Sequence, residues 1–544
     1  MVLGFQGGVF SLPAQKLIYP GEWAYDALTA LSLEQRVLFF SGSMLTVGQF
    51  RSMLTEIDPE TLSPAGKLLY GELEEYLGGR GFLSIESGAL GIDVDPSLNA
   101  EFYARSNKNL NYIYDNNKRK PFLAIPFGLS FSPYLAAEMD VALEQKWDAA
   151  FFKDNYTNFP AGDAFNFNMP KRAYLSVGLP FKETAGLQFR IGIGENFFGR
   201  TKTGSIILSD YMKDATYGSV SIYSPAVKYS GNIMQLEVNK YFYFHQLEMR
   251  FFKRVSLSAV EGLMVNAPME LRFLNPVMIY HSFSAYSEYG DYNGPASGFE
   301  SEDSRVASFF GLKLELQLLK HLRLYGLWAL NELRTTAESG EDLDALKPDS
   351  MAIQGGGEAF IPSARGYWSF GLEGVYTYPY VYVLRSSTWS FYKPKTGKSG
   401  DTQFWTGTPL GPDTAAATLW AGFHTSKWSL SGSFLFAAQG ERSGLDIFDG
   451  DAYHPWKTYK KDPGNNYAAA LEETRLIAPT GTPAFTYQIS FSAAWSIYKW
   501  LAFSFDPGYK IINNYHHEKG RTEHGFEAAF GVKLIPPQLN LKFN

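Results

Sequence analysis

Short segments of alternating apolar and polar residues recur along this chain. In residues 485–491, the side chains of Phe485, Tyr487, Ile489 and Phe491 fall on one side, and threonine, glutamine and serine fall on the other. This alternation predicts a strand that buries only one face. In a soluble sandwich the apolar face would pack in a shared core, whereas in a membrane barrel it would face lipid and the polar face would line a wet lumen.

The same pattern is spread over most of the chain. We expect strands at 174–179, 187–193, 312–318, 428–436, 503–505 and 526–534. With weaker segments included, the pattern predicts about eighteen strands over about 450 residues, and even strand numbers are the rule for bacterial barrels. The fold class that we predict is therefore all-β, a transmembrane antiparallel β-barrel.

Short and long connections between these strands alternate. Short turns are expected at 182–186, 253–254, 320–321, 363–366, 425–427 and 498–499, and long insertions near 148–170, 264–304, 386–415 and 439–483. Short turns at one end and long loops at the other are typical of outer-membrane barrels. Aromatic residues at expected strand ends fit the girdles at the two membrane interfaces; they are Trp368, Tyr376, Tyr378, Trp420, Trp495 and Trp500. We expect the insertion at 264–304 to fold inward and narrow the lumen.

The first 80 residues differ from the rest because their apolar residues follow helical spacing, as in Val47, Phe50 and Leu54. A helix that begins near Lys67 is expected to end at Gly78. We therefore predict a periplasmic helical subdomain at 1–80 and an outer-membrane barrel with long extracellular loops at 81–544. The start of the chain lacks a basic region, so residues 1–15 are expected to contain either the remnant of a truncated export signal or an expression start.

Composition agrees with a barrel. Aromatic residues make up 16% of the 544 residues, yet the mean hydropathy is only -0.17, because half of each barrel strand stays polar. No apolar stretch reaches the roughly 18 residues that a helical span needs. The absence of cysteine removes disulfides, thiolate catalysis and cysteine metal sites. A net charge of -7 gives no reason to expect a nucleic-acid partner.

Three segments, in order, resemble the Wzi-type capsule assembly family of outer-membrane proteins. They are the glycine-rich and aromatic segment 192–209, the segments 245–250, 258–261 and 271–276, and the paired strands and acidic tip at 311–332. The C-terminal run 539–544, with Phe543 next to last, also resembles the signature by which bacterial barrels are recognised for insertion.

The resemblance implies a barrel of eighteen strands in the bacterial outer membrane, with a periplasmic helical element. It implies a non-enzymatic surface lectin that retains capsular or related polysaccharide, with no cofactor. The expected partners are surface polysaccharide and outer-membrane lipids, and the barrel is expected to be a monomer. The alternative function is a porin, a diffusion channel for small solutes, which would need an open lumen lined by charges.

Three tryptophans are candidate glycan platforms, because sugars stack their apolar faces on aromatic rings. Trp389, Trp405 and Trp456 lie in polar insertions and not in alternating strands. In the alternative interpretation, the same rings pack the loops against each other or mark a membrane girdle.

A second candidate set consists of His245, Glu248, Arg250 and Glu261. A histidine near a carboxylate could form a metal or acid–base site. However, strand geometry points residues 245 and 248 to opposite faces and residues 248 and 250 to the same face. We therefore predict a structural network in the lumen, with Glu248 and Arg250 as a charge pair.

Other chemical motifs are weak. His516, His517 and His524, and separately Asp446, Asp449 and Asp451, lack the spacing of a known metal site. The sequence contains no Gly-x-Ser-x-Gly elbow, Walker loop or His-Glu-x-x-His motif. We expect no metal, no cofactor and no enzymatic activity.

Overall fold

The computed structural model describes most of the chain. The described residues are 12–79, 82–87, 89–110, 119–145, 156–160, 165–168, 170, 172–182, 184–212, 214–281, 306–332, 348–383, 390–397, 400–442, 475–536 and 539–542.

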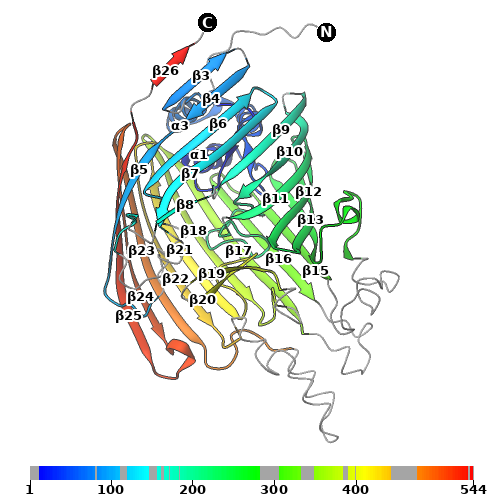
Figure 1. The fold of residues 1–544 in the computed structure, drawn as a ribbon, viewed down its shortest axis with the longest axis vertical. Coiled ribbons are helices and arrows are strands. Elements are labelled where there is room, and N and C mark those ends of the chain that lie inside the picture. Colours follow the sequence, from blue (N-terminus) through cyan, green and yellow to red (C-terminus); the bar gives the residue numbers. More distant parts are fainter. Residues whose placement is uncertain are drawn as a thin grey trace, which may run out of the picture.

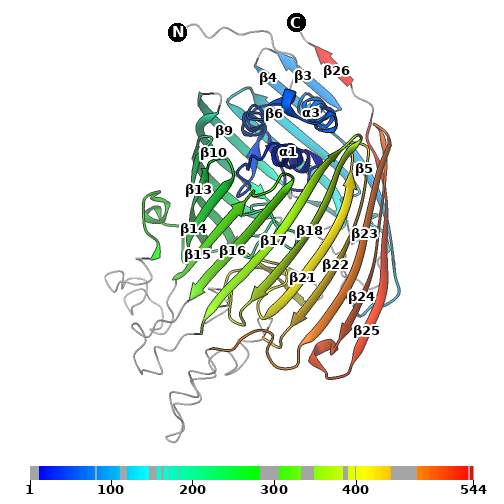
Figure 2. The same ribbon diagram turned by 180° about the vertical axis from the view of Figure 1, so that it is seen from behind.

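Eighteen antiparallel strands form a closed barrel within this part of the chain (Figures 1 and 2). They are β5 (Ser97–Arg105), β6 (Leu123–Phe131), β7 (Leu135–Gln145), β9 (Ala173–Lys182), β10 (Ala185–Gly194), β11 (Ala215–Tyr223), β12 (Val227–Glu237), β13 (Lys240–Phe251), β14 (Val255–Asn266), β15 (Val306–Leu316), β16 (Leu322–Glu332), β17 (Ser350–Ser363), β18 (Gly366–Thr377), β21 (Thr414–His424), β22 (Trp428–Gln439), β23 (Ala484–Tyr498), β24 (Leu501–Asn513) and β25 (Thr522–Leu534). The ring closes where β25 pairs with β5, with Phe530 opposite Phe102. The predicted fold class and strand number are confirmed.

Several short strands lie outside this ring, and four of them form two separate two-stranded sheets. They are β1 (Leu17–Ile18), β2 (Leu45–Thr46), β3 (Leu83–Ser87), β4 (Leu90–Val94), β8 (Phe165–Asn168), β19 (Tyr392–Gly397), β20 (Gly400–Trp405) and β26 (Leu539–Lys542). β4 pairs with β6 and β3, and β26 pairs with β3 in parallel. In Figure 1 the labelled strands β3, β4 and β26 lie at the end of the molecule where both termini are drawn. The last strand of the ring, β25, ends at Leu534, before Pro536.

The outer wall of the barrel is apolar. In β23 the outward residues Phe491 and Trp495 are 54% and 55% exposed, and Ile489 lies opposite Tyr509 of β24 on the same face. A soluble sandwich would cover such residues with a second sheet, whereas a barrel turns them toward lipid. None of the described helices is long and apolar enough to span a membrane.

The N-terminal helices form a cluster inside one end of the barrel (Figure 2). They are α1 (Trp23–Glu34), α2 (Val47–Leu54), α3 (Pro64–Leu77) and the short η1 (Pro59–Thr61). Thr46 and Gln49 form a capping box at the start of α2, and Ser63 caps α3 just before Pro64, which satisfies amide groups that the first turn leaves free. Their apolar faces form a core that includes Phe360 and Tyr367 of the wall.

Two long connections fold into the lumen and one folds outside it. The described residues of the first are 195–212 and 214, and those of the second are 378–383, 390–397 and 400–413; both pack within the barrel. The segment that follows β14, with η4 (Leu271–Leu274), instead lies on the outer wall, where Phe273 contacts Tyr243 (Figure 1, green, at the side of the barrel). The prediction that the insertion at 264–304 folds inward is therefore wrong for 267–281, because this segment packs on outward aromatic residues of β13. Its remainder lies outside the described residues.

Candidate functional site

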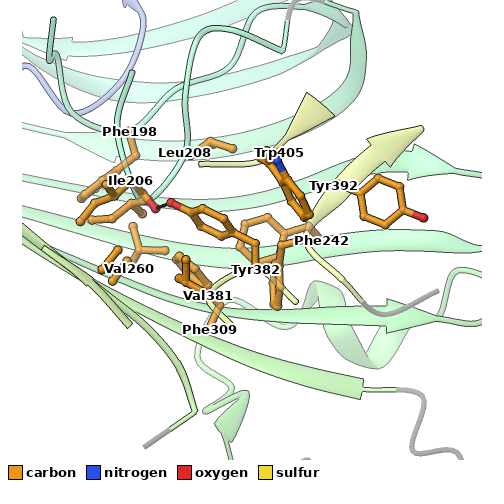
Figure 3. Close-up of a cluster of buried hydrophobic side chains, with 14 of the residues drawn as sticks. Phe198, Ile206, Leu208, Phe242, Val260, Phe309, Val381, Tyr382, Tyr392 and Trp405 are labelled. Carbon is orange, nitrogen blue, oxygen red and sulfur yellow. Dashed lines mark hydrogen bonds between the residues drawn. The ribbon is translucent and has the colours of Figure 1, made fainter. Parts of the chain in front are cut away.

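The two inward loops meet in an aromatic core within the lumen (Figure 3). Tyr382 donates a hydrogen bond from its hydroxyl to the carbonyl of Ile206 at 2.6 Å, which joins the second loop to the first. Burial raises the pKa of Tyr382, so this phenol stays a donor at neutral pH. Phe242 and Phe309 of the barrel wall form the opposite side of the core. The loops are therefore fixed to each other and to the wall.

A carboxylate beneath this core holds the first loop. Glu373 of β18 accepts hydrogen bonds from the backbone amides of Lys202 and Thr203, both at 2.9 Å. The Tyr325 hydroxyl donates to the same carboxylate at 2.5 Å. Glu373 and Tyr325 belong to wall strands that are distant in sequence from the loop. The wall therefore sets the position of the loop.

A buried ion network lies beside this carboxylate. Arg323 of β16 is bonded to Glu315 at 3.0 Å and to Glu358 at 2.5 Å, and Lys313 is bonded to Glu315 at 2.8 Å. All four side chains are almost fully buried. They satisfy one another's charge inside the barrel, as buried ions must.

The helical cluster is attached to the wall through the predicted lumen residues. The amide of Gly42 donates to Glu248 at 3.1 Å, and Gln246 donates to the same carboxylate at 2.8 Å. Arg250 forms an ion pair with Glu56 at 2.5 Å. Lys228 of β12 donates a further hydrogen bond from the wall to Ser43, and Arg200 of the first inward loop pairs with Asp26 of α1.

The predicted lumen network is wrong in two respects: its charge pair and two of its members. Glu248 and Arg250 share the inner face, but Glu248 bonds Gly42 in the connection between α1 and α2, Arg250 bonds Glu56 just after α2, and they do not pair with each other. His245 and Glu261 are opposite each other in the register of β13 and β14, and alternation turns both outward. There the His245 ring lies 4.4 Å from the ring of Tyr280. The lumen network therefore excludes His245 and Glu261.

The candidate tryptophans are placed only in part. Trp405 ends β20 and is 7% exposed, with its ring 6.1 Å from Tyr382 and 5.8 Å from Tyr392. It supports the loop core from within. Trp389 and Trp456 lie outside the described residues, and a role of the three rings in glycan binding stays a prediction.

The candidate metal residues show other contacts. His524 lies 2.8 Å from the hydroxyl of Tyr509, and His517 lies 2.9 Å from the carbonyl of Thr482. No group of three metal-binding side chains occurs among the described residues. Asp446, Asp449 and Asp451 are not among them.

One side of the lumen stays accessible to water. Ser492 and Ser496 of β23 alternate with lipid-facing residues and so face inward, yet both are exposed. Asp506 of β24 accepts a hydrogen bond from Ser492 at 2.6 Å on this wall. Within the described part of the chain, the helical cluster and the inward loops therefore fill the lumen against β10–β18 and leave the inner face of β22–β24 open.

Asp413 holds the outer end of the inward loops in place. Its carboxylate is fully buried and accepts hydrogen bonds from the amides of Arg442 and Thr480, each at 3.0 Å, and from the Thr480 hydroxyl. It thereby joins the loop before β21 to both ends of the connection between β22 and β23.

Replacing Asp413 with asparagine should loosen this junction. The variant Asp413→Asn presents an NH₂ group to donors, and leaving buried donors unpaired costs about 1–3 kcal/mol. We expect faster hydrogen exchange at the amides of Arg442 and Thr480. Asp506→Asn is the control, since its carboxylate lies on the open wall. Unchanged protection at both amides would show that Asp413 does not hold the loops.

Sequence reasoning missed Arg323, Glu358, Glu373 and Asp413. A usable signal was present for the first three, because each occupies a polar position in an alternating strand and so predicts a lumen-facing charge. Asp413 follows Gly411-Pro412, and this pattern predicts only a turn.

No family model matches this chain, and no curated protein matches it. Among solved structures, it is similar to Wzi of Escherichia coli, an outer-membrane protein involved in group 1 capsule assembly and described as a carbohydrate-binding β-barrel. The identity is 12% and the TM-score 0.58, over 96% of this chain and 100% of Wzi.

A second solved structure in the comparison is OprD of Pseudomonas aeruginosa, with 10% identity and a TM-score of 0.39 over 82% of this chain and 95% of OprD. The resemblance to the Wzi type is confirmed at the level of fold, which includes the closed ring and its lipid-facing wall. The chain is therefore a bacterial outer-membrane β-barrel with the fold of Wzi.

Proposed function

We propose that this protein is a non-enzymatic outer-membrane barrel that binds or anchors exported capsular or related polysaccharide at the cell surface. The observation that carries the proposal is the filling of the lumen. The helical cluster occupies the end with short turns, and two loops from the other end form a fixed core inside the wall. Fixed loops suit binding, because a preorganised surface loses little entropy when a ligand binds.

The orientation follows from the connections. Short turns of bacterial barrels face the periplasm and long loops face outward, so the helical subdomain at 1–80 would be periplasmic. We propose Trp389, Trp405 and Trp456, which belong to the long connections of that end, as the residues on which sugars stack. Wzi, which shares the fold, is described as carbohydrate-binding. The barrel would contact outer-membrane lipids and act as a monomer.

A diffusion channel for small solutes is the second candidate. The observation in its favour is the open inner face of β22–β24, where Ser492 and Ser496 are exposed to water. Ion conductance separates the two functions, because a channel needs a path through the whole barrel whereas a lectin does not.

Binding of the purified protein to surface polysaccharide from its own cells tests the proposal. We expect retention of the polysaccharide by the wild type and reduced retention by Trp389→Ala and Trp456→Ala, because each change removes a stacking surface. The matched control is Trp495→Ala on the outer wall, which should bind as the wild type does. Wild-type protein that retains none of the polysaccharide, or cells lacking the protein that keep all of it, would contradict the proposal.

A further inference from the structure

Two buried arginines of the barrel wall differ in their partners. Arg323 and Arg190 are 3% and 4% exposed, and Arg323 bonds two buried carboxylates. Arg190 of β10 forms no ion pair within the described part of the chain, where its Nε and Nη1 atoms also lack a hydrogen-bond partner. Its neighbours Phe189 and Ile191 are exposed on the lipid side, so alternation turns the guanidinium into the lumen. A buried charge without a counter-charge is costly.

Three serine hydroxyls adjoin this arginine on the next two strands. Ser219 of β11 lies directly opposite Arg190, and in the next row Ser221 lies opposite Ser230 of β12. Rows on one face of a sheet are about 7 Å apart. All three hydroxyls are buried and have no hydrogen-bond partner among the described residues. Gln188 of β10, opposite Ser221, adds an acceptor oxygen in the same condition.

A second cation lies on the side of these serines that faces the short turns. Lys228 of β12 is 2% exposed and donates a hydrogen bond to Ser43 at 2.6 Å. It is repelled by Arg190 and attracted by Glu248, whose carboxylate already accepts two hydrogen bonds. The two cations and this carboxylate together carry a net positive charge.

A cleft leads to Lys228 from the end of the barrel with short turns. Its empty volume is about 360 Å³, part of which is open solvent. It is lined by residues of the helical cluster and the wall, among them Ser52, Tyr223, Lys228 and the paired Arg250 and Glu56. The opposed serines lie one row further into the barrel than Lys228, and the buried arginine lies one row beyond them. A small ligand in the cleft would therefore meet the lysine first.

We propose that the patch formed by Arg190, Ser219, Ser221, Ser230 and Lys228 binds a small oxyanion that enters through this cleft. The two cations supply the opposite charge, and the serine hydroxyls donate hydrogen bonds. Arginine suits this ligand because its fixed N–H groups match phosphate and carboxylate oxygens. The oxygen of Gln188 can accept a hydrogen bond from a partly protonated phosphate or from the hydroxyl of a sugar acid. The site does not depend on the proposed binding of polysaccharide.

Isothermal titration calorimetry of the full chain in detergent tests this site, with inorganic phosphate and glucuronate as separate probes. We expect at least one of them to bind with one ion per barrel. The tighter probe shows whether the patch suits free phosphate or the carboxylate of an acidic sugar. Arg190→Gln should weaken this binding at least about tenfold, because it removes a charged hydrogen-bond donor.

Arg521→Gln is the matched control, since Arg521 is exposed and already pairs with Glu518; it should bind as the wild type does. Binding of neither probe would overturn the site. Equal binding by the wild type and Arg190→Gln would overturn it as well, because the anion would then lie elsewhere on the barrel.

Thermal unfolding gives a second measurement with a variant that keeps both cations. A ligand that binds only the folded state raises Tm, so the bound probe should raise Tm of the wild type above its value in potassium chloride of equal ionic strength. The shift should be smaller for Ser219→Ala/Ser221→Ala, which lacks two of the donors. A full shift in this folded double variant, or no shift in the wild type, would contradict the proposed patch.

Discussion

Deletion of residues 1–79 is expected to convert a poorly conducting barrel into a strongly conducting one. The deleted part contains α1, α2 and α3, whose apolar core fills one end of the lumen. Beyond it, the inner face of β22–β24 is lined by exposed residues such as Ser492. Removing the helices should therefore join this wet side of the lumen to both solutions. Single-channel current in planar bilayers measures the change.

The deletion leaves the strands from β3 onward and their long loops intact, so the comparison isolates the helical cluster. Arg521→Ala provides a control at the loop end, because Arg521 and its partner Glu518 are exposed. It should conduct as the wild type does. If the intact protein already carries the current of an open pore, the diffusion channel becomes the better supported of the two functions. The filling of the lumen would then no longer support polysaccharide binding.

Replacing Arg323 with methionine should strongly destabilise the barrel. The variant Arg323→Met leaves the buried carboxylates of Glu315 and Glu358 without the guanidinium that bonds both. Lys313 remains beside Glu315 only. Removing one partner of a buried ion pair costs about 3–5 kcal/mol, because the remaining charge is left uncompensated. Urea unfolding of the vesicle-inserted barrel measures the loss in free energy of unfolding.

Arg521→Ala is the matched control for this measurement as well. It removes an arginine from an exposed ion pair with Glu518 at 2.8 Å, and such pairs contribute about 0–1 kcal/mol. Equal effects of the two substitutions would mean that the network around Arg323 is solvated in the folded barrel. A double variant Arg323→Met/Glu358→Gln should recover part of the loss, because it removes one of the unpaired charges.

The sequence was sufficient for the architecture because that information is local. Alternation in segments such as 485–491 identifies a strand and its lipid-facing side without reference to any other part of the chain. Helical spacing around Phe50 likewise located α2, and parity placed Glu248 and Arg250 on one face. These features depend on residues a few positions apart, which the chain displays directly.

Only the tertiary structure decided how the loops and the charges are arranged. Arg250 pairs with Glu56, which is far away in the sequence, and not with nearby Glu248. The segment after β14 packs outside the wall on Tyr243, although its composition suited an inward plug. Parity tells which face a side chain occupies, but it does not tell which distant segment covers that face. Partner choice depends on closure of the whole barrel, so it could not be read from the sequence pattern.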